Sequence, residues 1–145
     1  MNILRLIAAV TGLLVVTVLG APGDRIDDQS LKNPIRLNLG AKGFILLKEL
    51  PNGQQEATLV PTRPGKQPGV SVELKKEPEF IALTLRNRLP KALRYRAAVR
   101  LKGSGAYVET SLIVPVTPGL ISFESWQDPI EELVLFDFKL TDEKL

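Results

Sequence analysis

The chain of 145 residues contains neither cysteine nor histidine. Without histidine it has no Ser-His-Asp triad and no histidine-ligated zinc, and it lacks the usual base that titrates near neutral pH. Without cysteine it has no thiol nucleophile, no thiolate metal site and no disulfide. Only carboxylate pairs and Ser/Lys dyads remain as catalytic options. We therefore expect a protein that is not an enzyme, with no metal and no cofactor.

Aromatic residues and net charge are also low. Aromatic residues make up 6% of the chain, and the formal net charge is +3, from 19 Lys and Arg against 16 Asp and Glu. Nucleic-acid-binding domains carry a stronger basic excess, and those that stack bases place aromatic side chains among the basic ones. No nucleic acid is expected as a partner.

The first residues have the composition of an export signal. Arg5 precedes an uncharged apolar run over residues 6–21, and small residues follow. A basic start, an apolar stretch and a small-residue cleavage site define a secretory signal peptide. As a helix the run would span about 24 Å, less than the roughly 30 Å of a bilayer core. We expect residues 1–23 to be a signal peptide cleaved after Gly20 or Gly23, with an uncleaved membrane anchor as the alternative.

The predicted export and the length of the mature chain indicate the compartment and the number of domains. Small exported domains usually rely on disulfides, and this chain has none. A mature chain of about 120 residues forms one core and not two. We expect a single domain over residues 34–145, in the bacterial periplasm or outside the cell. Residues 24–33 are polar without any period and predict a flexible tether.

Most of the remaining sequence alternates between apolar and polar residues over short segments separated by turn signals. In residues 93–102, apolar and basic side chains alternate. Pro51-Asn52-Gly53 predicts a hairpin turn between two such segments. In the last segment one face is expected to carry Val134, Phe136, Phe138 and Leu140. The pattern predicts an all-β fold, an antiparallel β-sandwich of about 7 to 9 strands, with a barrel as the alternative.

One segment resembles a known class of domains. Residues 87–95 read Asn-x-Leu-Pro-x-x-Leu-x-Tyr, and the single Trp of the chain is Trp126. With these features the chain resembles, over about residues 80–140, the bacterial immunoglobulin-like and fibronectin-like domains. The resemblance implies an immunoglobulin-like sandwich and assigns no functional residue.

Basic residues gather between positions 86 and 102, where no acidic residue occurs. Four of them, on one face of a predicted strand, would form a ridge about 20 Å long; they are Arg94, Arg96, Arg100 and Lys102. Such a ridge could bind an anionic glycan or lipid. The alternative is a solvated outer face paired across strands with acids such as Glu109.

Two further groups of residues are candidates for function. One group consists of four carboxylates near Trp126, which are Glu124, Asp128, Glu131 and Glu132. They could form a catalytic carboxylate pair like that of a glycosidase. The alternative is that they are solvated residues of turns and strand edges. They lack the closely spaced Asp pattern of a calcium loop. The Pro-rich residues 61–69 form either a binding loop that presents Arg63 and Lys66 or a solvated connection.

These observations predict an exported, non-enzymatic protein that acts by surface contact with an envelope component or another protein. A partner strand added to an exposed sheet edge would provide such a contact. The alternatives are a module for an anionic glycan or lipid, and an envelope domain that touches the membrane only through its N-terminal segment.

Overall fold

The computed structural model describes residues 24–110 and 115–142, together with four two-residue strands before them. These strands are β1 (Ile3–Leu4), β2 (Ala9–Val10), β3 (Leu13–Leu14) and β4 (Leu19–Gly20). Apart from them, the signal peptide expected over residues 1–23 lies outside the described residues. Its export role and its cleavage stay predictions.

The described part of the chain is all-β, as the alternation predicted. Its further strands are β5 (Arg25–Ile26), β6 (Ile35–Asn38), β7 (Lys42–Glu49), β8 (Gln55–Val60), β9 (Val70–Lys76), β10 (Ile81–Asn87), β11 (Ala92–Leu101), β12 (Tyr107–Thr110), β13 (Ile121–Trp126) and β14 (Ile130–Thr141). One short 3-10 helix, η1 (Asp28–Ser30), follows β5. The hairpin turn between β7 and β8 falls on Pro51-Asn52-Gly53, and Gly53 supplies the positive φ, 78°.

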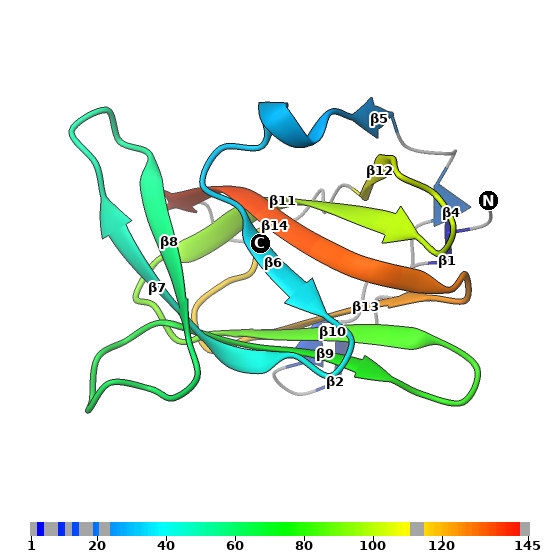
Figure 1. Ribbon diagram of the computed structural model, residues 1–145. Coiled ribbons are helices and arrows are strands. Elements are labelled where there is room, and N and C mark those ends of the chain that lie inside the picture. Colours follow the sequence, from blue (N-terminus) through cyan, green and yellow to red (C-terminus); the bar gives the residue numbers. More distant parts are fainter. Residues whose placement is uncertain are drawn as a thin grey trace.

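The strands form two layers that pack face to face (Figure 1). The lower sheet has the order β13-β10-β9-β7-β8, with β3 and β2 beyond β13. The upper sheet has the order β5-β12-β11-β14-β6. All pairs among β5 to β14 are antiparallel. The chain crosses between the layers from β10 to β11 and from β13 to β14, and this arrangement is a β-sandwich.

The core lies between the two inner faces. On β11 the inward side chains are those that the alternation predicted, Leu93, Tyr95, Ala97 and Val99. They meet Val70, Val72 and Leu74 of β9 and Leu83 and Leu85 of β10. Each fully buried Leu or Val side chain contributes about 1.5–3 kcal/mol. Burial on this scale gives a disulfide-free domain its stability.

A bulge in β14 divides its apolar residues between two faces. Arg94 pairs with Lys139 and Arg96 with Phe136, so β14 advances three residues while β11 advances two. Asp137 lies in this step with a left-handed φ of 52°. The expectation of one shared face is therefore wrong: the outer face carries Val134 and Phe136, and the core contains Phe138 and, partly buried, Leu140.

The segment expected as a tether lies against the outer face of the upper sheet. β5 pairs with β12, and the side chain of Asp27 caps η1. Ile26 and Leu31 pack there with four residues of the sheet, Ala98, Tyr107, Val134 and Phe136. Ile26 and Leu31 are five positions apart, a spacing that fits neither a helix nor a strand period. The sequence pattern alone therefore indicated no element here.

Candidate binding surfaces

The predicted basic ridge lies on the outer face of the upper sheet and takes part in cross-strand pairs. The guanidinium of Arg96 donates from Nε and Nη2 to the two carboxylate oxygens of Glu109, at 2.6 and 2.8 Å. It also lies 4.9 Å from the ring centroid of Phe136. The pairing with Glu109 raises the pKa of Arg96. Arg96 is thus held by a neighbouring strand, as the paired alternative expected.

The other ridge residues differ in their surroundings. Arg100 lies 3.8 Å from Glu131 and 3.7 Å from Glu132, and Arg94 also has an interaction partner. Among the residues that the structure describes, Lys102 forms no ion pair, and it lines a cavity at one end of the sandwich. The four side chains therefore do not present four free positive charges to a ligand.

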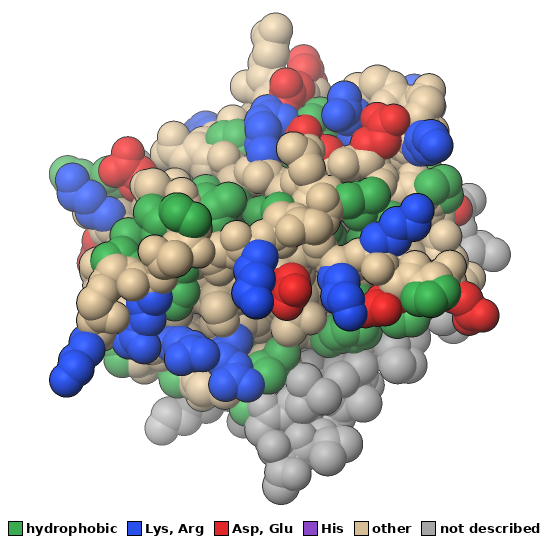
Figure 2. Space-filling view, turned by 60° about the horizontal axis from the view of Figure 1, so that its bottom comes forward, with side chains coloured by type: hydrophobic (Ala, Val, Ile, Leu, Met, Phe, Trp, Pro, Cys, Tyr) green, Lys and Arg blue, Asp and Glu red, His purple; other side chains and the backbone are tan. Residues whose placement is uncertain are grey.

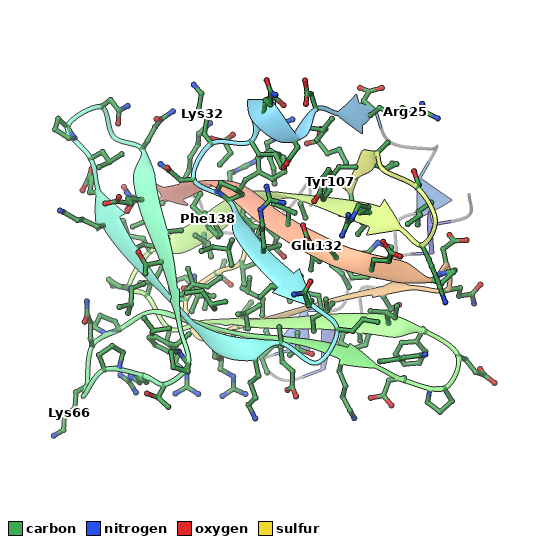
Figure 3. All side chains as sticks on the ribbon, in the orientation of Figure 1. Arg25, Lys32, Lys66, Tyr107, Glu132 and Phe138 are labelled. Atoms are coloured by element: carbon green, nitrogen blue, oxygen red, sulfur yellow. The ribbon has the colours of Figure 1, made fainter. Side chains whose placement is uncertain are left out.

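A polar network that the sequence did not indicate ties η1 and β6 to β12 and β14. Arg36 donates from Nη1 to Tyr107 Oη and to Glu132 Oε1, both at 2.9 Å, and from Nη2 to Asp28. Tyr107 Oη donates to Glu132 Oε1 at 2.6 Å (Figure 3). The bond to Asp28 raises the pKa of Arg36, while burial, followed by the bond to Glu132, raises that of Tyr107. This network of ion pairs and hydrogen bonds joins four elements, so it could be found only once these elements were placed together.

The four candidate carboxylates lie in different environments. Glu124 is buried between the sheets, 1% exposed, and accepts a hydrogen bond from Tyr95 Oη at 3.3 Å. Asp128 and Glu131 line the cavity at the loop end, and Glu132 belongs to the Arg36 network. Trp126 is buried in the core. The burial of Glu124 contradicts the expectation that it is a solvated turn or edge residue.

The cavity at the loop end has a volume of about 580 Å³, within the range of small-molecule sites. Four turns line it, those between β6 and β7, between β9 and β10, between β11 and β12, and between β13 and β14. Leu39, 39% exposed, is the one large exposed hydrophobic side chain among the described residues, and it lies here. Oδ2 of Asp128 is buried without a hydrogen-bond partner within the described ranges.

The Pro-rich loop over residues 61–69 is folded by one of its own side chains. Arg63 donates from Nε to the carbonyl of Gln67 and from Nη2 to the carbonyl of Lys66, both at 2.9 Å. Its guanidinium carbon lies 5.9 Å from the ring centroid of Phe44. Lys66 extends away from the molecule (Figure 3). Arg63 therefore holds the loop in its conformation, and Lys66 is the side chain that the loop exposes to solvent.

The open edge of the lower sheet is β8. Among the described residues β8 is hydrogen-bonded to no strand but β7, although it also lies close to β14 and β6 of the upper sheet. None of the backbone hydrogen bonds outside the strand ladders, as far as the structure describes them, involves residues 55–60. Ala57 and Leu59 point inward against the core, whereas Glu56 and Thr58 are exposed. This strand has the free ladder positions that strand addition needs.

Two other classes of site were sought in the described residues. No cluster of three or more acidic side chains is placed there to hold a metal ion. Within the same ranges, no helix has the length and apolar character to span a membrane.

Comparisons of the chain with protein-family models, with curated proteins and with solved structures found no match.

Proposed function

We propose that the protein is an exported, non-enzymatic β-sandwich of the immunoglobulin-like type that binds a protein or another envelope component through the edge of β8. Export rests on the basic start and the apolar run of the N-terminal segment. The observation that carries the binding role is the unpaired edge of β8.

Strand order supports the immunoglobulin-like type. In such domains strands B and E are neighbours in one sheet, C and F are neighbours in the other, and the chain crosses from B to C and from E to F. β10, β11, β13 and β14 have these positions in this order. β6 pairs with β14 on the side opposite β11, where strand G pairs with F. Trp126 differs from the antibody pattern, because it stands on β13 and not on β11.

The register of the hairpin determines which groups of β8 face outward. The amide of Leu50 donates to the carbonyl of Gln54 at 2.8 Å, which makes this pair hydrogen-bonded. Bonded and non-bonded pairs alternate along an antiparallel ladder. Counting from Gln54, the residues that bond to β7 are Glu56, Thr58 and Val60. The backbone groups of the intervening residues, Gln55, Ala57 and Leu59, are directed away from β7.

β8 also lacks three of the common protections of an edge strand. Natural edges are blocked by Pro, by Lys or by bulges. Residues 55–60 contain neither Pro nor Lys, and the β7–β8 register runs without a shift from Glu49 to Phe44. A partner strand can therefore extend the lower sheet at this edge.

Ala57→Pro tests this function, because it removes one outward amide while leaving the bonds to β7. The tagged protein from residue 24 onward would be used to capture partners from envelope extract of the source organism, at low and high salt. The proposal expects a partner retained at high salt by the wild type and by Glu56→Gln, with at least about tenfold less captured by Ala57→Pro. Equal capture by a folded Ala57→Pro would refute edge pairing.

Amide hydrogen exchange gives a second measurement that needs no substitution. On binding of the captured partner, the amides of Ala57 and Leu59 should exchange more slowly, because they would donate to the added strand. Unchanged exchange at both amides in the complex would assign the contact to another surface.

A further inference from the structure

The outer face of the lower sheet carries basic side chains from separate parts of the chain. Arg86 of β10 pairs in register with Ser71 of β9, which in turn stands opposite Phe44 of β7. Lys42, two residues before Phe44, stands opposite Glu73 on the same face. Figure 2, which brings this face forward, shows Lys and Arg side chains gathered at its lower left.

The 61–69 loop adjoins this face. Arg63 lies over Phe44, and the amide of Arg88 donates to the carbonyl of Gly69 at 3.0 Å. The loop therefore adds Lys66 to the basic residues of the sheet, and Arg88 stands beside them. We call Lys42, Lys66, Arg86 and Arg88 the lower basic face; all four side chains are exposed.

These cations differ from the predicted ridge in having no ion pairs. Among the described residues no carboxylate lies within 4.0 Å of the charged nitrogens of Lys42, Lys66, Arg86 or Arg88. Lys42 stands opposite Glu73 without forming such a pair. Their positive potential is available to a ligand from solution.

A hollow lies between two of these cations. It has a volume of about 200 Å³, and Lys42, Arg86, Ser71, Thr84 and Glu73 contribute to its lining. It thus combines two cations, two hydroxyls and one carboxylate. The cations suit an anionic group, while Glu73 accepts hydrogen bonds from hydroxyl groups.

We propose that the lower basic face binds an anionic polysaccharide. A polysaccharide has both groups that the hollow accommodates, anions for Lys42 and Arg86 and hydroxyls for Glu73. Lys42 and Arg86 stand on strands separated by β9, about 10 Å apart. This separation suits anionic groups on different sugar units of one polysaccharide.

Two other polyanions fit the face less well. The negative charge of an anionic membrane would repel the carboxylate of Glu73. The described part of this face also has no large exposed apolar side chain that could insert into the lipid. Single-stranded nucleic acid stacks on exposed aromatic rings. On the described part of this face Phe44 is 5% exposed beneath Arg63, and Phe123 is only partly exposed, in edge contact with Phe80.

The test uses dextran sulfate, polygalacturonate, neutral dextran and phosphatidylglycerol vesicles as probes of the tagged protein, with binding measured by calorimetry across a salt series. The variant is Lys42→Glu with Arg86→Glu. Its matched control is Arg25→Glu with Lys32→Glu, which changes net charge equally on the opposite side of the molecule (Figure 3). All four side chains are exposed, and circular dichroism would verify folding.

The proposal expects one or both anionic polysaccharides to bind at low salt, at least about tenfold more weakly in Lys42→Glu/Arg86→Glu, with little change in the control. Neutral dextran should not bind. Absence of polysaccharide binding, equal weakening in the two double variants, or binding to vesicles alone would each overturn it. Ala57→Pro should bind the polysaccharide as the wild type does, so this site and the β8 edge can fail separately.

Discussion

Asn87 shows how a single buried side chain holds the crossing between the sheets. It is fully buried at the end of β10, and its Nδ2 donates to the carbonyls of Lys91 and Val116, at 2.9 and 2.7 Å. Its Oδ1 accepts from the amide of Leu89 at 2.9 Å. These bonds satisfy backbone groups at the crossing, where the carbonyl of Val116 also accepts from the amide of Leu93 at 2.9 Å. The Asn at the start of the motif in residues 87–95 therefore has a structural role.

Asn87→Asp should destabilise the protein by about 3 kcal/mol or more. The change replaces the two amide hydrogens with an oxygen that faces two carbonyls in a buried site. Urea unfolding would measure the loss. Asn52→Asp is the control, because the exposed Asn52 keeps its acceptor for the amide of Gln54; it should change stability by less than about 0.5 kcal/mol. Equal effects of the two changes would contradict this account of Asn87.

Ionisation of Tyr107 is expected to lower the stability of the folded protein at alkaline pH. Its pKa is raised above the ordinary 10.0 by burial and by the bond to Glu132. Below pH 10 the phenol is protonated in both states; above it the unfolded chain ionises first, so stability falls as pH rises through the folded pKa. Tyr107→Phe should have a lower melting temperature at pH 8 and a shallower decline between pH 10 and 12. Parallel curves for the two proteins would exclude Tyr107 as the cause.

At the scale of elements, close approach of β7 to the end of the 61–69 loop depends on a glycine. A Cβ at Gly69 would stand 2.8 Å from Cζ of Phe44 and 2.9 Å from the carbonyl oxygen of Ile45. Phe44 is also covered by Arg63, so its ring has little room to move. Loop and strand therefore support each other, and this junction keeps the loop that carries Lys66 beside the outer face of the lower sheet.

Gly69→Ala should destabilise the protein by about 1–3 kcal/mol, because the added methyl group overpacks this junction. Thermal unfolding would measure the change. Gly105→Ala is the matched control, since a Cβ there meets no atom within 4 Å. A Gly69→Ala protein as stable as the control would show that Phe44 and the loop can separate without cost.

At the scale of the whole molecule, two cores stabilise a chain without disulfides. The larger lies between the sheets, and the smaller joins Ile26 and Leu31 to the outer face of the upper sheet. The smaller core begins directly after the predicted signal peptide. Cleavage after Gly20 or Gly23 would remove β1 to β4, including the pairing of β3 with β13, and would keep all the described residues of both cores.

The mature protein from the envelope of the source organism should begin at residue 21 or residue 24, since the apolar run is short for a membrane span and ends in small residues. Intact mass spectrometry would show this. Replacing Gly20 and Gly23 with Val should leave the full chain unprocessed. A full-length mass in the wild type, recovered with membranes, would favour the anchored alternative.

The order and bounds of most strands could be predicted from sequence, because alternation and turn residues are local signals. Residues 93–102 and the hairpin turn at Pro51-Asn52-Gly53 are examples. The bulge at Asp137 could not, because the residues around it continue an even alternation while the backbone shifts their faces. The packing of residues 24–33 also gave no periodic signal.

By itself the sequence determined the all-β class, the absence of disulfides and of histidine chemistry, and the alternating basic strand. Tertiary structure decided which charges are free. Arg96 meets Glu109 from β12, while Lys42 and Arg86 stand on one face without carboxylate partners among the described residues. The reason is physical: an ion pair depends on distances between strands, and sheet order determines those distances independently of separation along the chain.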